Sequence, residues 1–481
     1  MQKDIVIAAM PFMHTTEPMM APGYLKAIVE EAGYSAVALD LNAEFLNRIK
    51  TRPIYHQAHK EYNESNNPDK RYQLLQSPEF AEEISEEVTY MVERILSYNP
   101  KRVGLSLLAY TCQRLSRWVC VRLRQVAPEV EIVMGGCGTK HTLKQESNSF
   151  VEELKQQGLI DHFIMGDAER AIVEYMNGNL NYPGIDNDSW EQPRDLSKFP
   201  FPDYSDYDFD LYEDKVIPIL DSQGCVRQCK FCDIIQHWQK FTFKKSSITF
   251  DEMIHQSEKH GIYRFSMRSS LSNGNMNEFR SWLELVSNYN ETVPKNKKFS
   301  WSGYFIIRPK ESHPEEMWEK LGKSQGMLIV GLETVIERSR WEIGKKFSNT
   351  DVDYHFEMGR KYNVPLLLLM MASNPGENHE DFEFTKKWFS DRVNYAGKSI
   401  IGCSWTLATI LPGTAWDTQY SDRLIKGPNN TIDPYWREWT EKGNELTHKE
   451  RTDYFSEIIE ICLPFNSTNY WENRRSLDYD N

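Results

Sequence analysis

The stretch Gly224-Cys225-Val226-Arg227-Gln228-Cys229-Lys230-Phe231-Cys232-Asp233 decides most of what this chain can be. Its three cysteines follow a CxxxCxxC spacing, with an aromatic residue directly before the last cysteine. A four-iron, four-sulfur (4Fe-4S) cluster is normally held by four cysteine thiolates, so this run supplies one fewer than the cluster needs. The spacing therefore predicts a cluster bound by Cys225, Cys229 and Cys232, with one iron left open for a small chelating ligand.

Two other uses of clustered cysteines are a zinc site and a disulfide. A structural zinc ion normally takes four ligands, often supplied as two pairs, and the next cysteines, Cys403 and Cys462, lie far downstream. A disulfide would leave one of the three cysteines over, and disulfides are rare in reducing compartments. A zinc-binding interaction module is the non-enzymatic alternative.

The composition indicates a soluble globular protein: of 481 residues, 40% are hydrophobic and 26% are charged. No apolar run approaches the length of a membrane span, and the first residues are typical of a strand rather than of a signal peptide. We therefore expect a cytoplasmic protein. A net charge of -14 argues against a broad nucleic-acid surface, because phosphate binding depends on clustered Lys and Arg.

Short apolar runs alternate with amphipathic stretches over residues 1–180, which indicates a doubly wound, Rossmann-like α/β domain. A polar stretch over 50–80 is expected to be an insertion or a long loop. Residues 181–214 are rich in Asn, Asp, Gly and Pro and predict a linker. The predicted strands of the first domain are 5–9, 36–40, 103–107, 131–134 and 162–165. Its predicted helices are 24–32, 81–97, 113–126 and a last one that follows Gly166-Asp167-Ala168-Glu169.

The alternation resumes after the linker and predicts a partial (β/α)6 TIM-like barrel over 215–420. Chemistry in such barrels lies at the C-terminal ends of the strands, and the cysteine run follows the first strand. Residues 421–481 are expected to form a mainly helical extension, whose aromatic residues Tyr435, Trp436, Trp439 and Tyr470 either pack or line an entrance. The six predicted strands are 216–220, 263–267, 299–307, 327–331, 365–371 and 399–405.

Three short motifs follow the cysteines, each at a predicted strand end. They are Gly331-Leu332-Glu333-Thr334, Asn374-Pro375-Gly376-Glu377 and Leu411-Pro412-Gly413-Thr414. Either Pro-Gly sequence taken alone is common in ordinary turns, because proline and glycine are typical turn residues. Their order after the cysteine run makes the three motifs informative together.

The cysteine run and these motifs resemble the radical S-adenosylmethionine (radical SAM) superfamily, in the branch with an N-terminal cobalamin-binding domain. The resemblance implies that S-adenosylmethionine caps the open iron and is cleaved reductively to a 5′-deoxyadenosyl radical. It implies that Phe231 packs against the adenine and that Glu333 binds the amino group or the ribose. It also implies a small-molecule substrate and an electron donor such as flavodoxin or ferredoxin.

Residues 1–180 resemble that cobalamin-binding domain at Met10-Pro11, at Pro22-Gly23-Tyr24-Leu25, at Asp40 and in two glycine motifs after predicted strands. The resemblance implies cobalamin contacts at Gly135, Gly136, Gly166 and Glu169, since glycines let a backbone approach a bulky ligand. The DxHxxG motif of histidine-ligated cobalamin proteins is absent. His14 lies in the corresponding loop, between the first predicted strand and the first predicted helix, but the other residues of the motif do not surround it. A degenerate domain that only docks substrate is the rival interpretation.

The chain also departs from the family pattern. After the second barrel strand, where acidic residues are common in the family, it has Arg268-Ser269-Ser270-Leu271-Ser272-Asn273. Ser269, Ser270 and Asn273 either bond a substrate or cofactor or form a solvated loop. Arg308, at the end of the third strand, either pairs with a functional carboxylate or forms a surface salt bridge.

The expected reaction is cobalamin-dependent methylation of an unactivated carbon. A radical rearrangement, a cyclisation or an oxidation without methyl transfer is the alternative within the same chemistry. Methylthiolation is a further alternative and needs a second cluster, for which Cys112, Cys120 and Cys137 are the local trio. Cys120 lies within a predicted helix, where small buried cysteines are common.

Overall fold

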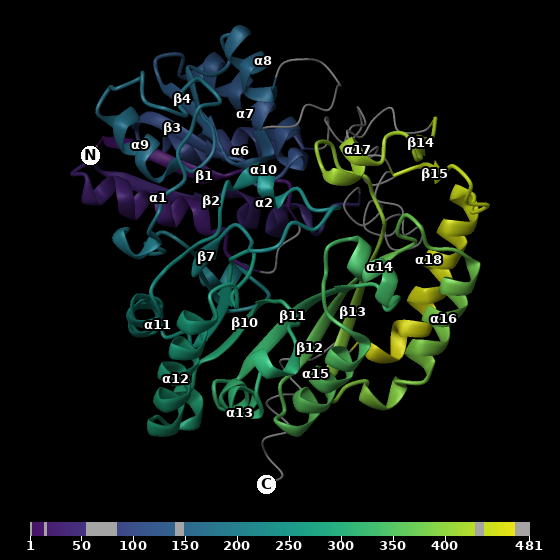
Figure 1. The fold of residues 1–481 in the computed structure, drawn as a ribbon. Helices are drawn as coiled ribbons and strands as arrows, with labels where there is room; N and C mark the ends of the chain where they lie inside the picture. The colour runs from purple at the N-terminus through teal and green to yellow at the C-terminus, as the bar shows by residue number, and fades with distance from the viewer. Residues whose placement is uncertain (1, 14–16, 54–83, 140–148, 429–436, 467–481) are drawn as a thin grey trace. The chain divides into compact units, whose positions relative to one another are not determined.

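The computed structural model describes residues 2–13, 17–53, 84–139, 149–428 and 437–466. The chain divides into two compact units, Met1–Pro218 and Ile219–Asn481. Each unit is built on a sheet with parallel strands and associated helices (Figure 1), which confirms the predicted α/β class.

The first unit contains a five-stranded parallel sheet in the order β2-β1-β3-β4-β5. Ile5, Val6 and Ile7 are at most 2% exposed, as expected of a strand in the middle of a covered parallel sheet. The strand order reverses between β1 and β3, and ligands of open parallel sheets bind outside the carboxyl ends at such a reversal. The strands are β1 (Lys3–Ala9), β2 (Ala36–Asp40), β3 (Pro100–Ser106), β4 (Glu131–Gly135) and β5 (His162–Ile164).

The helices of the first unit include two that the sequence did not predict, α2 and α8. Helix α2 was missed because it follows β2 without a turn: Asp40 ends the strand, and its carboxylate accepts a hydrogen bond from the Ala43 N–H at 3.0 Å as the helix N-cap. Helix α1 also begins four residues before the predicted start. The helices are α1 (Met20–Glu31), α2 (Leu41–Ile49), α6 (Ser85–Leu96), α7 (Gln113–Val126), α8 (Phe150–Gln156) and α9 (Ala168–Met176).

The segment predicted as a linker makes specific contacts within the first unit. The buried ammonium of Lys26 on α1 pairs with Asp203 at 3.0 Å and Asp206 at 2.6 Å. The Tyr212 hydroxyl donates to the Asp40 carboxylate at 2.8 Å. These contacts fix the segment against α1 and β2.

A six-stranded sheet in the order β13-β12-β11-β10-β9-β6 has its last five strands in the second unit, and β6 spans the unit boundary at Pro218. Strands β9 to β13 pair in parallel and in chain order, as expected for repeated strand-helix units. A separate antiparallel pair, β7 (Ser222–Gln223) with β8 (Thr242–Phe243), brackets the cysteine run. The sheet strands are β6 (Ile217–Ile219), β9 (Arg264–Met267), β10 (Ser300–Phe305), β11 (Gly326–Glu333), β12 (Leu366–Ala372) and β13 (Ile400–Leu407).

Helices pack on one face of this second sheet. Trp301 and Phe305 of β10 contact Phe279 of α12, with ring centroids 6.1 and 6.0 Å apart. Side chains alternate along a strand, so Ser302 and Tyr304 lie on the opposite face. The helices before the last strand are α10 (Ile234–His237), α11 (Ser246–His260), α12 (Met276–Thr292), α13 (Glu315–Lys323), α14 (Glu337–Glu342), α15 (Asn349–Lys361) and α16 (His379–Ser390).

The C-terminal part contains α17 (Ala415–Gln419), α18 (His448–Cys462) and a short antiparallel pair that the sequence did not predict, β14 (Leu424–Lys426) with β15 (Trp439–Glu441). Trp439 is buried and its indole N–H donates to the Ala408 carbonyl at 2.8 Å, so it packs. Tyr435, Trp436 and Tyr470 lie outside the described residues. Across the described segments, no helix combines the length and the apolar character that a bilayer crossing requires.

Candidate functional site

The three cysteines of the run lie on one loop between β7 and the short helix α10. All three are free thiols of intermediate exposure. Gly224 enters the loop with φ +74°, and a Cβ there would lie 2.4 Å from the Lys240 carbonyl oxygen, so the entry requires glycine. Inside the loop, the Cys232 N–H donates to the Cys229 carbonyl at 3.0 Å. The backbone thus holds the thiols in one compact turn.

Two later segments fix this loop from outside. The Lys230 N–H donates to the Ile343 carbonyl at 3.0 Å, and the Lys230 carbonyl accepts from the Trp416 N–H at 3.0 Å. The Gln236 side-chain amide donates to the Pro412 carbonyl at 2.8 Å. The Pro-Gly-Thr turn that the sequence singled out therefore contacts the segment that carries the cysteines.

Two of the thiols, those of Cys229 and Cys232, lie in an environment that favours their protonated form. Burial raises the pKa of Cys232 to about 12, and burial also raises the pKa of Cys229 while the positive charge of Lys345 opposes this. Metal ligation requires thiolates, so loading this loop with metal would release protons. The donor set, three free thiols on a loop that faces a cation, fits a cluster that is held by three thiolates.

Lys345 lies between the cysteine loop and Glu333. Its ammonium donates to Glu333 Oε1 at 2.8 Å and to the Gly331 carbonyl at 2.7 Å, and it lies 5.8 Å from the centre of the Phe231 ring. Burial lowers the pKa of Lys345, but the electrostatic interactions with Glu333 and Cys229 outweigh burial and raise the pKa above its ordinary value. The side chain therefore stays a cation beside the thiols.

Glu333 ends β11 in a strained conformation. Its φ of +65° falls in the left-handed region that non-glycine residues rarely adopt, and the β11–β12 register shifts between Gly331 and Glu333. The residue is 8% exposed. Strain of this kind persists where the surrounding structure fixes it and is concentrated at functional sites. The structure thus sets the predicted S-adenosylmethionine ligand Glu333 near the cysteines, joined to them through Lys345.

Phe231 anchors the loop to an apolar cluster that includes Ile343, Ile410 and Trp416. Its ring centroid lies 5.7 Å from that of Trp416. The predicted packing of Phe231 against an adenine stays a prediction.

The Pro-Gly-Glu turn after β12 joins the Gly-Leu-Glu-Thr motif through a buried hydrogen bond. Thr334 Oγ1 donates to Glu377 Oε1 at 2.7 Å, and the Asn374 N–H donates to Glu377 Oε2 at 2.9 Å. Burial raises the pKa of Glu377, and these donors oppose the increase. Glu377 therefore holds the ends of β11 and β12 together.

The strand ends on the β9 side carry different chemistry. Asn273 is fully buried. Its side-chain oxygen accepts a hydrogen bond from the Ile306 N–H at 2.9 Å, and its side-chain amide donates one to the Ile306 carbonyl at 2.9 Å. Ser269 Oγ lies 3.3 Å from Ser272 Oγ. The Asn273 side chain therefore binds the protein's own backbone and does not belong to a solvated loop. Arg308 forms no ion pair with any carboxylate of the described residues, so the surface salt bridge, one of its two predicted roles, does not form there.

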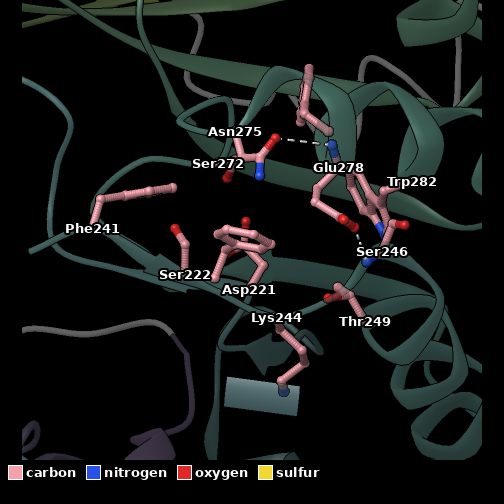
Figure 2. Close-up of a pocket in the computed structure, with 12 residues that line it drawn as sticks. Asp221, Ser222, Phe241, Lys244, Ser246, Thr249, Ser272, Asn275, Glu278 and Trp282 are labelled. Carbon is pink, nitrogen blue, oxygen red and sulfur yellow. Dashed lines mark hydrogen bonds between the residues drawn. The ribbon is translucent and has the colours of Figure 1, made fainter. Parts of the chain in front are cut away.

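A small pocket lies just before the cysteine loop, between the β7–β8 pair and the starts of α11 and α12 (Figure 2). Its cavity volume is about 30 Å³, and Asp221, Ser222, Lys244, Ser272 and Trp282 are among its lining residues. Burial raises the pKa of Asp221 to about 6. The pocket has the size of a water-filled recess rather than of a cofactor site.

The edge of the first sheet carries the residues predicted to contact cobalamin. Gly136 has φ +101° and is exposed, and a Cβ there would lie 2.3 Å from the Leu107 carbonyl oxygen. Gly135 before it is half-buried. Gly166 lies directly under the Trp190 ring, 2.1 Å from where its Cβ would be, and Glu169 is 5% exposed. Exposed backbone at Gly136 fits a flat macrocycle, whereas Gly166 is covered; His14 lies outside the described residues.

The second cysteine trio does not form a comparable loop. Cys112 and Cys120 are fully buried and Cys120 lies within α7, where burial raises its pKa to about 12. In the part of the chain that the structure describes, no three His, Cys, Asp or Glu side chains lie close enough to share a single metal ion. In a four-iron cluster the cysteines bind different irons, so they lie farther apart than the ligands of one ion.

Sequence reasoning missed Lys345. The residue lies 12 positions after Glu333 in the run Gly344-Lys345-Lys346, and no motif marks it. Gly344, with φ +92°, brings its backbone to the loop, where an added Cβ would lie 3.2 Å from the Gln228 carbonyl oxygen. A glycine followed by a lysine was the only sequence signal, and such pairs are common.

No protein-family model and no curated protein matches the sequence. Among solved structures, a match is the radical S-adenosylmethionine methyltransferase TsrM from Kitasatospora setae with tryptophan substrate and a SAM analogue bound (15% identity, TM-score 0.62, 88% of this chain and 79% of that chain). TsrM with cobalamin and a four-iron, four-sulfur cluster bound matches 94% of this chain and 85% of that chain at 15% identity and TM-score 0.61.

The chain has the fold of cobalamin-dependent radical S-adenosylmethionine enzymes. Another match is the cobalamin-dependent S-adenosylmethionine radical enzyme OxsB with aqua-cobalamin and S-adenosylmethionine bound (10% identity, TM-score 0.64). That match covers 95% of this chain and 66% of OxsB. At these identities the likeness concerns the fold, and at that level it confirms the resemblance predicted from the sequence.

Proposed function

We propose that this chain is a radical S-adenosylmethionine enzyme in which Cys225, Cys229 and Cys232 hold a four-iron, four-sulfur cluster. The observation that carries the proposal is the arrangement of three free thiols on one loop beside Lys345 and the strained Glu333. When bound, such a cluster supplies the electron that cleaves S-adenosylmethionine to a 5′-deoxyadenosyl radical, which then abstracts hydrogen from a substrate. A flavodoxin or a ferredoxin would supply the electron.

The residues around the cysteines have separable roles in this proposal. Glu333 accepts hydrogen bonds from the amino group or the ribose of S-adenosylmethionine, because a carboxylate offers several acceptor positions. Lys345 holds the Glu333 carboxylate in place from the protein side at 2.8 Å. Phe231, which packs on Trp416, would contact the adenine.

We further propose that the first domain, residues 1–180, binds cobalamin at the carboxyl edge of its sheet, and that residues 215–420 form the partial barrel. The exposed backbone at Gly136 and the half-buried Gly135 support this site. A bound corrin would supply a methyl group, so that the reaction is methylation of an unactivated carbon on a small molecule. Gly166 would take part only through the Trp190 ring that covers it.

The proposed function is tested by anaerobic reconstitution with iron and sulfide, followed by dithionite, S-adenosylmethionine and hydroxocobalamin. We expect 5′-deoxyadenosine and about one corrin per chain. Glu333→Gln should weaken S-adenosylmethionine binding by about tenfold, since one charge-assisted hydrogen bond is weakened. Glu315→Gln, in an exposed pair with Lys361, is the matched control. Absence of 5′-deoxyadenosine from a chain loaded with iron contradicts the proposal.

A further inference from the structure

Arg308 presents an unfilled hydrogen-bond donor near the cysteine loop. It follows β10 by three residues, and its Nη2 donates to the backbone carbonyls of Asn273 at 3.2 Å and Gly274 at 3.4 Å. Its Nε is buried and has no hydrogen-bond partner among the described residues. A buried donor without an acceptor is costly, so the position of this guanidinium suits an acceptor from outside the chain.

A second guanidinium, that of Arg227, lies within electrostatic range of the first. Burial and then the positive charge of Arg227 lower the pKa of Arg308, while the thiol of Cys225 acts in the opposite direction. The chain has 70 acidic and 56 basic residues, yet neither arginine forms an ion pair with a carboxylate of the described residues. Neighbouring like charges are unfavourable unless an anion lies between them, and guanidinium groups bind carboxylate or phosphate with two parallel hydrogen bonds.

The sheet face beside these arginines is apolar and accessible. Tyr304 of β10, four residues before Arg308, lies on the face opposite the helices and is 38% exposed. The strand register places Tyr304 beside Ile329, and Ile329 beside Leu367. The next row along the strands holds Leu369, whose neighbour on β13 is the exposed Ser404. The half-buried Ile329, Leu367 and Leu369 thus form an apolar surface on the face that Tyr304 occupies, and Arg308 follows Tyr304 by four residues.

We propose that Arg308 and Arg227 bind an oxyanion, a carboxylate or a phosphate, of the second substrate, and that the apolar body of this substrate lies against Tyr304, Ile329 and Leu367. The assignment to the substrate rests on the proposed function. The oxyanion fixes one end of the molecule at the cysteine loop, and the apolar face holds the C–H bonds of the other part near the site of radical formation. The substrate class is therefore a small amphiphilic anion with an aromatic or aliphatic body.

Binding is measured by isothermal titration calorimetry on the reconstituted chain with two probes, 3-phenylpropionate and 3-phenylpropionamide. These probes share one apolar body and differ in charge. We expect the chain to bind the carboxylate about tenfold more tightly than the amide, the size of one charge-assisted hydrogen bond. Arg308→Gln should bind both probes equally, and Arg308→Lys should keep part of the preference. Equal or undetectable binding of both probes by the unmodified chain overturns the proposal.

Three controls show whether the preference arises at Arg308 and belongs to the substrate. Arg280→Gln, an exposed arginine of α12 that bonds the Ser312 carbonyl, should leave the preference intact. The affinity for S-adenosylmethionine should stay within twofold in Arg308→Gln; a loss there instead assigns the arginine to that molecule's own carboxylate and overturns the substrate assignment. The reconstituted chain could also keep the preference for the carboxylate probe and yet never yield 5′-deoxyadenosine. That result would contradict the proposed function but would still support an oxyanion site at Arg308.

Discussion

The carboxyl edges of the two sheets present opposite chemistry on similar geometry. The edge of the second sheet carries three thiols, a buried cation paired with Glu333, and the Glu377 carboxylate, which accepts a hydrogen bond from Thr334. The edge of the first sheet carries glycines, an exposed backbone at Gly136 and an aromatic cover over Gly166. Parallel sheets bring ligands to the same edge in both cases, so the side chains at the strand ends decide which ligand can bind.

The largest expected effect comes from removing one thiol of the second unit. Cys229→Ala leaves two thiolates for four irons, so the iron content after reconstitution should fall to background and no 5′-deoxyadenosine should form. Cys137→Ala, a half-buried cysteine of the first unit, should change neither quantity. A loss of iron in Cys137→Ala would instead favour a second cluster at the first edge.

The second effect concerns the buried charge pair. Lys345→Met leaves the Glu333 carboxylate buried without its cation, which should lower the free energy of unfolding by about 3 kcal/mol. Urea denaturation checks this value. Lys361→Met removes the cation of an exposed pair with Glu315 and should cost less than about 0.5 kcal/mol. A similar decrease in the free energy of unfolding in both variants would contradict a greater stabilisation by the buried Lys345–Glu333 pair than by the exposed pair.

The first edge depends on backbone space rather than on charge. Gly136→Ala would force a Cβ against the Leu107 carbonyl at a positive φ, and we expect a loss of about 2 kcal/mol of stability. Gly33→Ala is the matched control, because Gly33 has φ +92° and no atom within 4 Å of an added Cβ; it should cost about 1 kcal/mol. Equal costs would mean that close packing does not shape the first edge.

The smallest effect concerns the pH dependence of the second unit. His313 and His355 are buried, with His313 Nδ1 2.8 Å from His355 Nε2. His313 Nε2 lies 3.4 Å from the side-chain nitrogen of Asn273. Burial, helped by the neighbouring His355, lowers the pKa of His313 to about 2, and burial lowers the pKa of His355 to about 4. Both rings stay neutral in the folded state, whereas the unfolded chain takes up protons below its histidine pKa of about 6.5. Stability is therefore lost as the pH falls below about 6.5.

This pH effect is measured by urea denaturation at pH 7.5 and 5.5. His313→Gln should reduce the loss of stability between these two pH values by about 1 kcal/mol. His379→Gln, at an exposed histidine, should leave the loss unchanged. An unchanged loss in His313→Gln would contradict a neutral buried ring.

Much of this architecture was predictable because apolar runs and glycines are local signals. The helix Gln113–Val126 and the strand Ala36–Asp40 match their predicted limits, and the spacing of Cys225, Cys229 and Cys232 singled out the loop that the structure forms. Lys345 was not predictable, since its partner Glu333 is fixed by a register shift and a positive φ that no residue pattern encodes. The short β14–β15 pair was missed because three-residue strands have too few positions for a period.

The measurement that tests the central claim most directly is electron paramagnetic resonance of the reduced, reconstituted chain before and after addition of S-adenosylmethionine. A cluster held by three thiolates leaves one iron open, so we expect about four irons per chain and a spectrum that changes when the ligand binds. An unchanged spectrum, or stoichiometric zinc in place of iron, would contradict the account.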